Sequence, residues 1–243
     1  MKRIKFLLFA MLCMVMSVSA RTFVVSVGVS NYKNSSMNLG QTTKDAKAFR
    51  NVMQNYTKDI TILTSKYANK ANVLEKLRAI CNRAQKTDKI IFYFSGHGYP
   101  GGVVTYDNTL TYQEINEVLA RSAASAKICI VDACHAGSVE DVKDNAKVYK
   151  APTTGNVVYM LGCRANEYSM EHAWIGHGYF TQGLLKGLRG KADSNRDKKI
   201  TVKELFNYAY NDVQHATSKM ADSQHPQLIG VKSVANIIII DWN

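Results

Sequence analysis

Apolar, β-branched segments alternate with segments of helical periodicity from Thr22 onward. Strands are predicted over 23–29, 59–63, 89–94, 127–131, 157–162 and 234–241, and helices over 44–56, 69–84, 112–121, 180–188 and 202–214. This alternation is typical of a mostly parallel sheet with helices on both faces. Because six strands need only one sheet, the pattern predicts a single α/β domain with a six-stranded sheet over 21–243.

The first 20 residues do not fit this alternation. Lys2, Arg3 and Lys5 precede an apolar run over 6–16, and small residues follow as far as Ala20. This pattern predicts a signal peptide over 1–20, cleaved after Ala20. The apolar run is shorter than the roughly 20 residues of a membrane span, and no other segment approaches that length. We therefore expect an exported protein, periplasmic or secreted, without a membrane span.

The composition is that of an ordinary globular protein, with 46% hydrophobic and 21% charged residues. The chain is basic, with 31 Lys and Arg against 19 Asp and Glu. A basic balance can favour anionic partners. However, the lysines are scattered and no nucleic-acid recognition signature accompanies them, which argues against nucleic acid as a partner. The sequence does not indicate an oligomeric state.

Four cysteines follow the predicted signal peptide, namely Cys81, Cys129, Cys134 and Cys163. An even number of cysteines in an exported chain is compatible with two disulfides. All of them except Cys134 fall within apolar helix or strand patterns, where a thiol acts as a small hydrophobic group. We therefore predict three buried free thiols and one cysteine with a separate role.

His97 and Cys134 each follow a predicted buried strand, within the motifs Ser95-Gly96-His97-Gly98 and Asp132-Ala133-Cys134-His135-Ala136-Gly137. The carboxyl ends of adjacent parallel strands meet at one edge of a sheet, so the two side chains should lie close together. A thiolate can attack a carbonyl carbon while an imidazole carries the proton. This predicts Cys134 as the nucleophile and His97 as the general acid and base. The backbone N–H groups of Gly98 and Cys134 are predicted oxyanion donors.

The two motifs resemble those of the caspase, metacaspase and paracaspase group of cysteine peptidases, particularly its bacterial metacaspase-like members. The resemblance covers nearly all of 22–243, including Gly178-Tyr179-Phe180-Thr181 at a helix start. It implies a caspase-like sheet and a cysteine peptidase. The caspase signature has Gln two residues before the Cys and the His about fifty residues upstream. Here Asp132 replaces the Gln, and His97 and Cys134 are 37 residues apart.

The resemblance also implies two acids in the substrate pocket. Metacaspase-like and paracaspase enzymes carry an acid two residues before the Cys, which Asp132 matches, and Asp45 looks like the second pocket acid. Two carboxylates would bind a guanidinium or ammonium group, so cleavage after Arg or Lys is expected. The alternatives are a helix-start acid at Asp45 and a turn residue at Asp132.

Two further segments have alternative interpretations. The 138–156 loop carries Lys143, Lys147 and Lys150, where a basic-specific peptidase could cut itself, although the lysines could instead solvate a loop. The 193–204 segment has the ligand spacing of an EF-hand calcium loop, with a Lys where the loop should have Gly. Its candidate ligands are Asp193, Asn195, Asp197, Lys199, Thr201 and Glu204. Thr201 and Glu204 also form a capping-box pattern, so calcium and a plain helix cap remain alternatives.

Together these features predict an exported cysteine endopeptidase that cleaves peptides or proteins after Arg or Lys through an acyl-enzyme. No cofactor is required, and calcium remains the alternative at 193–204. A second hypothesis is a binding or scaffold protein that keeps the fold without turnover.

Overall fold

A computed structural model describes residues 20–134, 156–164, 171–172, 176–220, 223–230 and 236–242. Apart from their last residues, the predicted signal peptide and the predicted self-cleavage loop lie outside the described residues. None of the described helices is long and apolar enough to cross a membrane.

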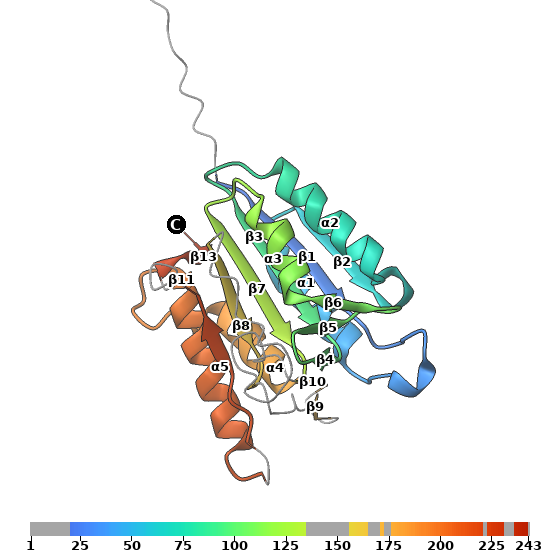
Figure 1. The fold of residues 1–243 in the computed structure, drawn as a ribbon. Coiled ribbons are helices and arrows are strands. Elements are labelled where there is room, and N and C mark those ends of the chain that lie inside the picture. The colour runs from blue at the N-terminus through green and yellow to red at the C-terminus, as the bar shows by residue number, and fades with distance from the viewer. Residues whose placement is uncertain are drawn as a thin grey trace, which may run out of the picture.

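Six strands form one sheet, in the order β12–β8–β7–β3–β1–β2 (Figure 1). Five of them are parallel, and β12 runs antiparallel to β8. Their bounds are β1 (Thr22–Gly28), β2 (Ile60–Thr64), β3 (Lys89–Ser95), β7 (Ala126–Asp132), β8 (Val157–Leu161) and β12 (Gln227–Ile229). The predicted α/β fold with a six-stranded, mostly parallel sheet is therefore confirmed.

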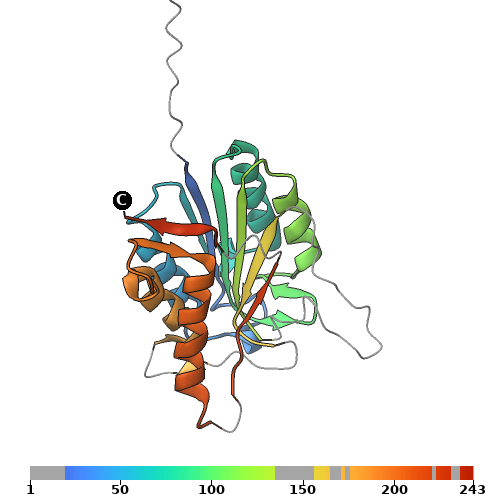
Figure 2. The same cartoon turned by 90° about the vertical axis from the view of Figure 1, so that its left-hand side faces the viewer.

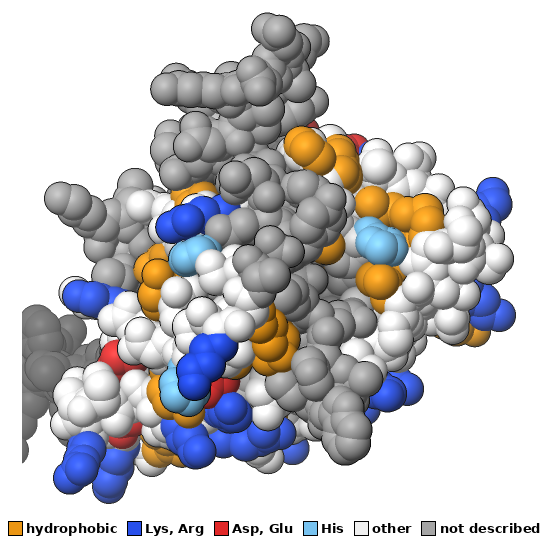
Figure 3. Space-filling view, turned by 90° about the horizontal axis from the view of Figure 1, so that it is seen from below, with side chains coloured by type: hydrophobic (Ala, Val, Ile, Leu, Met, Phe, Trp, Pro, Cys, Tyr) orange, Lys and Arg blue, Asp and Glu red, His pale blue; other side chains and the backbone are white. Residues whose placement is uncertain are grey.

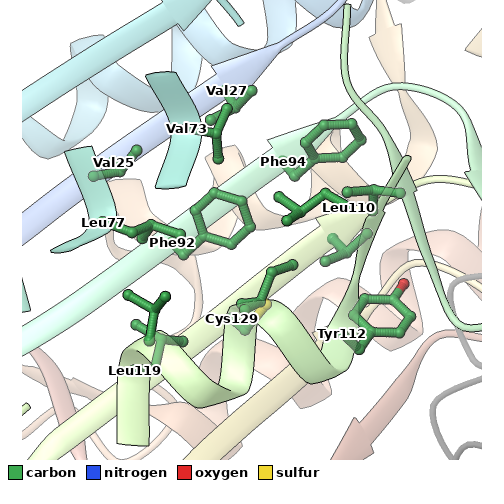
Figure 4. Close-up of a cluster of buried hydrophobic side chains, with 14 of the residues drawn as sticks. Val25, Val27, Val73, Leu77, Phe92, Phe94, Leu110, Tyr112, Leu119 and Cys129 are labelled. Carbon is green, nitrogen blue, oxygen red and sulfur yellow. The ribbon is translucent and has the colours of Figure 1, made fainter. Parts of the chain in front are cut away.

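Helices cover both faces of this sheet, as Figure 2 shows from the side. The helices are α1 (Thr42–Met53), α2 (Lys70–Arg83), α3 (Tyr112–Ala120), α4 (Tyr179–Lys186) and α5 (Val202–Thr217). One buried cluster joins the sheet to α2 and α3, and it includes Phe92, Leu77 and Leu119 (Figure 4). The other joins the sheet to α1, α4 and α5, and it includes Phe49 and Phe180. The predicted helices are all present, with bounds that differ by a few residues.

Side-chain caps fix several helix starts. The Asn69 side chain accepts a hydrogen bond from the backbone of Asn72 at the start of α2. Capping boxes begin α3, with Thr111 and Glu114, and α5, with Thr201 and Glu204. Each cap satisfies backbone N–H groups that the first helical turn leaves without a partner.

The last predicted strand is present, but the prediction that it belongs to the main sheet was wrong. The 234–241 segment forms β13 (Ile238–Asp241), which pairs with β11 (Lys199–Thr201) in a separate two-stranded sheet. The sixth strand of the main sheet is β12, which the sequence analysis did not identify. Its three residues are too few to show an alternating pattern, whereas the Ile-rich end of the chain has a strong strand pattern.

Short strands surround the carboxyl end of the main sheet. β4 (Gly98–Tyr99), β5 (Gly102–Val104) and β6 (Thr109–Thr111) form an antiparallel sheet that links β3 to α3. β9 (Glu171–His172) pairs with β10 (His177–Gly178) just before α4. These segments begin or end near the residues that carry the candidate chemistry.

Candidate active site

His97 and Cys134 meet at the carboxyl edge of the sheet. β3 and β7 pair in parallel, and their last residues, Ser95 and Asp132, lie opposite each other. The chain continues for two residues beyond each, so both candidate residues line one pocket of about 70 Å³. Figure 3 shows this end of the molecule from below, with histidine and hydrophobic side chains on its surface. The structure thus brings together the two residues predicted to form a nucleophile and base.

The loop that follows β1 holds the imidazole of His97 in place. The Nε2 atom of His97 lies 2.8 Å from the backbone carbonyl oxygen of Met37. Because a carbonyl can only accept, Nε2 must carry a proton, and in the neutral imidazole this leaves Nδ1 as the acceptor. A nitrogen with an available lone pair is what a general base requires.

Tyr32, from the same loop, supports His97 from a second direction. The backbone N–H of His97 donates to the Tyr32 hydroxyl at 2.7 Å, and the two ring centroids are 5.1 Å apart. The sequence analysis identified no residue that orients the imidazole. The orienting group is a backbone carbonyl, which leaves no signature in residue type, so sequence alone could not have revealed it.

The glycines around His97 allow close packing of the two strand ends. A side chain at Gly98 would overlap the backbone carbonyl of Cys134, and one at Gly96 would meet the ring of Phe94 and the hydroxyl of Tyr32. The Gly96 N–H donates to the carbonyl of Asp132 at 3.2 Å, so this N–H group already joins the ends of the two strands. The oxyanion role of the Gly98 and Cys134 N–H groups remains a prediction.

The four cysteines divide as predicted. Cys81, Cys129 and Cys163 are buried thiols outside any disulfide, whereas the Cys134 thiol is partly exposed. Burial raises the pKa of Cys81 to about 11 and raises the pKa of Cys129 further. Since the thiolate is the reactive form, these two thiols are poor nucleophiles near neutral pH.

Two buried carboxylates stand beside His97 and Cys134. Asp45 is 1% exposed and Asp132 is 5% exposed, and both line the same pocket together with Ser95 and Gly178. We refer to Asp45, Ser95, Asp132 and Gly178 as the acidic slot. The two acids come from different elements, the first turn of α1 and the end of β7. The slot therefore depends on the packing of α1 against the sheet.

The Asp45 carboxylate has two side-chain partners. Ser95 donates from Oγ to Oδ2 at 3.0 Å, and Nδ1 of His177 lies 2.6 Å from Oδ1. The dipole at the start of α1 favours a carboxylate in its first turn, as the alternative interpretation held. Asp45 nevertheless faces the slot as well. The sequence analysis missed His177, because its distance of 132 residues from Asp45 gives no local signal.

Asp132 connects the slot to α4. Its Oδ2 accepts from the backbone N–H of Thr181 at 3.0 Å and from the Thr181 hydroxyl at 2.6 Å. Asp132 thus caps α4, whose own N-cap residue, Gly178, has no capping side chain. A side chain at Gly178 would collide with this carboxylate. Asp132 is therefore both a slot residue and a helix cap contributed by another element.

The 193–204 segment forms the predicted capping box. Glu204 accepts from the backbone N–H and hydroxyl of Thr201 and from the Ser194 hydroxyl. Burial alone would raise the pKa of Glu204, but these hydrogen bonds hold it below its usual value. Lys198, which stands where an EF-hand loop has Gly, adopts a positive φ of 62°.

Three other candidate ligands of that segment accept hydrogen bonds from backbone groups. Oxygens of Asp193, Asn195 and Asp197 accept from backbone N–H groups within the loop. In the part of the chain that the structure describes, no three His, Cys, Asp or Glu side chains are placed to share a metal ion. The calcium hypothesis for Asp193, Asn195, Asp197, Lys199, Thr201 and Glu204 remains a prediction, and the helix cap is observed.

Comparisons with known proteins bear on the fold and on the family. Protein GSU0716 from Geobacter sulfurreducens, a solved crystal structure, superposes with a TM-score of 0.67 at 16% identity, over 89% of this chain and 97% of that one. This likeness shows a shared fold. A search of curated protein sequences found no significant match. The family model of the caspase domain matches residues 21–235. The chain therefore belongs to the caspase-domain family.

Proposed function

We propose that this chain is an exported, metacaspase-like cysteine endopeptidase that cleaves proteins after Arg or Lys. The observation that carries the proposal is the shared pocket of His97, Cys134, Asp45 and Asp132. Membership of the caspase-domain family supports the peptidase chemistry. The signal-peptide pattern over 1–20 supports export.

In the first half of the reaction, Cys134 is acylated. Nδ1 of His97 takes the thiol proton, and the sulfur attacks the carbonyl carbon of the scissile peptide bond. When the carbon–nitrogen bond breaks, the imidazolium returns the proton to the leaving amine. The Met37 carbonyl keeps the proton on Nε2 throughout, so the same ring nitrogen both receives and returns the transferred proton.

The second half releases the acyl group. Water donates a proton to Nδ1 of His97 while its oxygen attacks the thioester carbon, and the carbon–sulfur bond breaks with the proton returning to sulfur. The carboxyl product leaves and the starting thiol is restored. The backbone N–H groups of Gly98 and Cys134 are the proposed donors to the negative oxygen in both halves.

The acidic slot supplies the proposed preference for basic residues. An arginine or lysine side chain carries positive charge into a site that already holds two buried carboxylates. A guanidinium can pair with a carboxylate through two parallel hydrogen bonds, which gives direction as well as attraction. An aspartate side chain would meet like charges there. Self-cleavage in the 138–156 loop, at one of its lysines, is part of this proposal.

The test is hydrolysis of matched reporter peptides ending in Arg, Lys, Asp or citrulline before a fluorescent amine. We expect cleavage after Arg and Lys, and none by Cys134→Ala or His97→Ala. Folding of the variants is checked by circular dichroism. A correctly folded wild-type protein that cuts none of these peptides, before or after limited proteolysis, would support the scaffold hypothesis instead.

A further inference from the structure

A second and larger pocket lies beside His97, outside the acidic slot. It has a volume of about 610 Å³. Two segments form its walls, the loop after β1 and the turn between β5 and β6. Its lining includes Tyr32, Lys33, Met37, Val104, Tyr106 and Asp107. We refer to it as the Tyr106 pocket.

The walls of the Tyr106 pocket are joined by hydrogen bonds. The backbone N–H of Lys33 donates to the Tyr106 carbonyl at 2.9 Å, and the Tyr106 N–H donates to the Ala68 carbonyl at 3.0 Å. The turn is closed by the Thr105 hydroxyl, which donates to the Asn108 carbonyl at 2.6 Å. These bonds span three segments of the chain, so the pocket is formed before any ligand arrives.

The Tyr106 pocket and His97 share supporting residues. Tyr32 and Met37 line the pocket, and the same two residues hold the backbone and ring of His97. The apolar side chains of the pocket pack with the cluster between the sheet and α2 and α3. The acidic slot instead uses Asp45 of α1 and Gly178 before α4, on the other face. His97 therefore lines the pocket that contains the acidic slot and is held by two residues that line the Tyr106 pocket.

The chemistry of acylation indicates in which direction the substrate chain runs across the site. The residue before the scissile bond places its side chain in the acidic slot, and the leaving nitrogen must lie within reach of His97 to receive its proton. The chain after the scissile bond therefore continues past His97. The Tyr106 pocket is the hollow that adjoins the residues holding His97.

Resting on the proposed function, we propose that the Tyr106 pocket binds the substrate segment that follows the scissile bond and accepts an apolar or aromatic side chain from it. Tyr32, Met37, Val104 and Tyr106 supply apolar or aromatic surface. Lys33 and Asp107 provide one charge of each sign, so the pocket has no net charge to favour a charged side chain.

The experiment compares two kinds of substrate with the same arginine. One is a reporter whose leaving group is a small fluorescent amine with no residue after the arginine. The other is a set of internally quenched peptides with Phe, Leu, Ser or Asp at each of the first three positions after the scissile bond. Burial of a Phe or Leu side chain should raise kcat/KM about tenfold over Ser at one of these positions.

Two variants test whether the Tyr106 pocket is responsible. Tyr106→Ala and the milder Val104→Ser should remove the preference for Phe and Leu while leaving hydrolysis of the reporter unchanged. Tyr67→Ala is the matched control, since Tyr67 is a tyrosine 61% exposed and outside the pocket. This variant should cleave both kinds of substrate as the wild-type protein does.

Other outcomes would overturn the inference about the Tyr106 pocket or the proposed function. Equal cleavage of Phe, Leu and Ser peptides by the wild-type protein, or an apolar preference that survives in Val104→Ser and Tyr106→Ala, would overturn the inference. Equal losses on both substrate kinds in both variants would indicate a structural role and would also overturn it. If the wild-type protein does not cut the reporter or any peptide, the proposed function fails as well.

Discussion

Nδ1 of His177 lies 2.6 Å from Oδ1 of Asp45, so one carboxylate of the acidic slot is already paired with an imidazole. Asp45 is buried and the His177 side chain is 23% exposed. The imidazole thus reaches the carboxylate from the solvent side. A basic substrate side chain and His177 must therefore share or compete for the same anion.

This pairing predicts that His177 limits the binding of a basic side chain. The imidazole of His177 occupies Oδ1 of Asp45, the group that a guanidinium would contact. His177→Ala should therefore bind an Arg-ended peptide more tightly than the wild-type protein does.

Binding is measured by calorimetry on a Cys134→Ala background, which removes turnover. A citrulline-ended peptide is the uncharged control, and its affinity should not change. If the Arg-ended peptide binds equally well with and without the His177→Ala substitution, the expected competition does not occur.

Asp45→Asn should weaken the preference for a basic residue. The substitution keeps the shape of the side chain and removes its charge, so a positively charged substrate should lose an attractive interaction. We expect kcat/KM for an Arg-ended reporter to drop by a factor on the order of 10², with little change for the citrulline reporter. Equal losses on both reporters would indicate that Asp45 serves the fold and not recognition.

The thiols should differ in reactivity. With a pKa raised to about 11 by burial, Cys81 has little thiolate near neutral pH, and the pKa of Cys129 is raised further. Iodoacetamide at neutral pH should therefore label Cys134, and Cys81 and Cys129 should react only after denaturation. Peptide mass spectrometry would identify the labelled cysteines. Labelling of Cys81 as fast as Cys134 in the folded protein would contradict this ordering.

The start of α5 offers a test of the two interpretations of 193–204. Thr201→Ala removes the side-chain acceptor of the Glu204 N–H, and the expected cost is about 1 kcal/mol of unfolding free energy. For a domain of this size, that corresponds to a fall in Tm of about 2–4 °C. A plain cap predicts that calcium leaves the wild-type Tm unchanged. A calcium-dependent rise that is lost in Asp193→Asn would instead identify a calcium loop.

The fold was predictable where local patterns were strong. The buried β-branched runs of β1, β3 and β7, and the helical periodicity of α2, determine their own element types. β12 was missed because three residues carry little pattern and its pairing with β8 is set by tertiary packing. β13 was correctly predicted as a strand but assigned to the wrong sheet, since a strand pattern does not specify its partner.

The candidate site was predictable to the extent that it rests on strand ends. His97 and Cys134 follow adjacent parallel strands, so the sheet itself brings them to one edge. The Met37 carbonyl, the hydroxyl of Tyr32 and the His177 imidazole were not predictable. Each comes from a loop or short strand whose position depends on packing across the whole domain, and one of them is a backbone atom.

Covalent labelling of Cys134 by an arginyl ketone inhibitor tests the central claim most directly, because it requires the nucleophile, the base and the acidic slot together. Intact-mass and peptide mass spectrometry would locate the adduct. We predict a single adduct on Cys134 that is strongly slowed in His97→Ala and in Asp45→Asn. An adduct that forms equally fast in the folded His97→Ala variant, or that forms on another cysteine, would contradict the account.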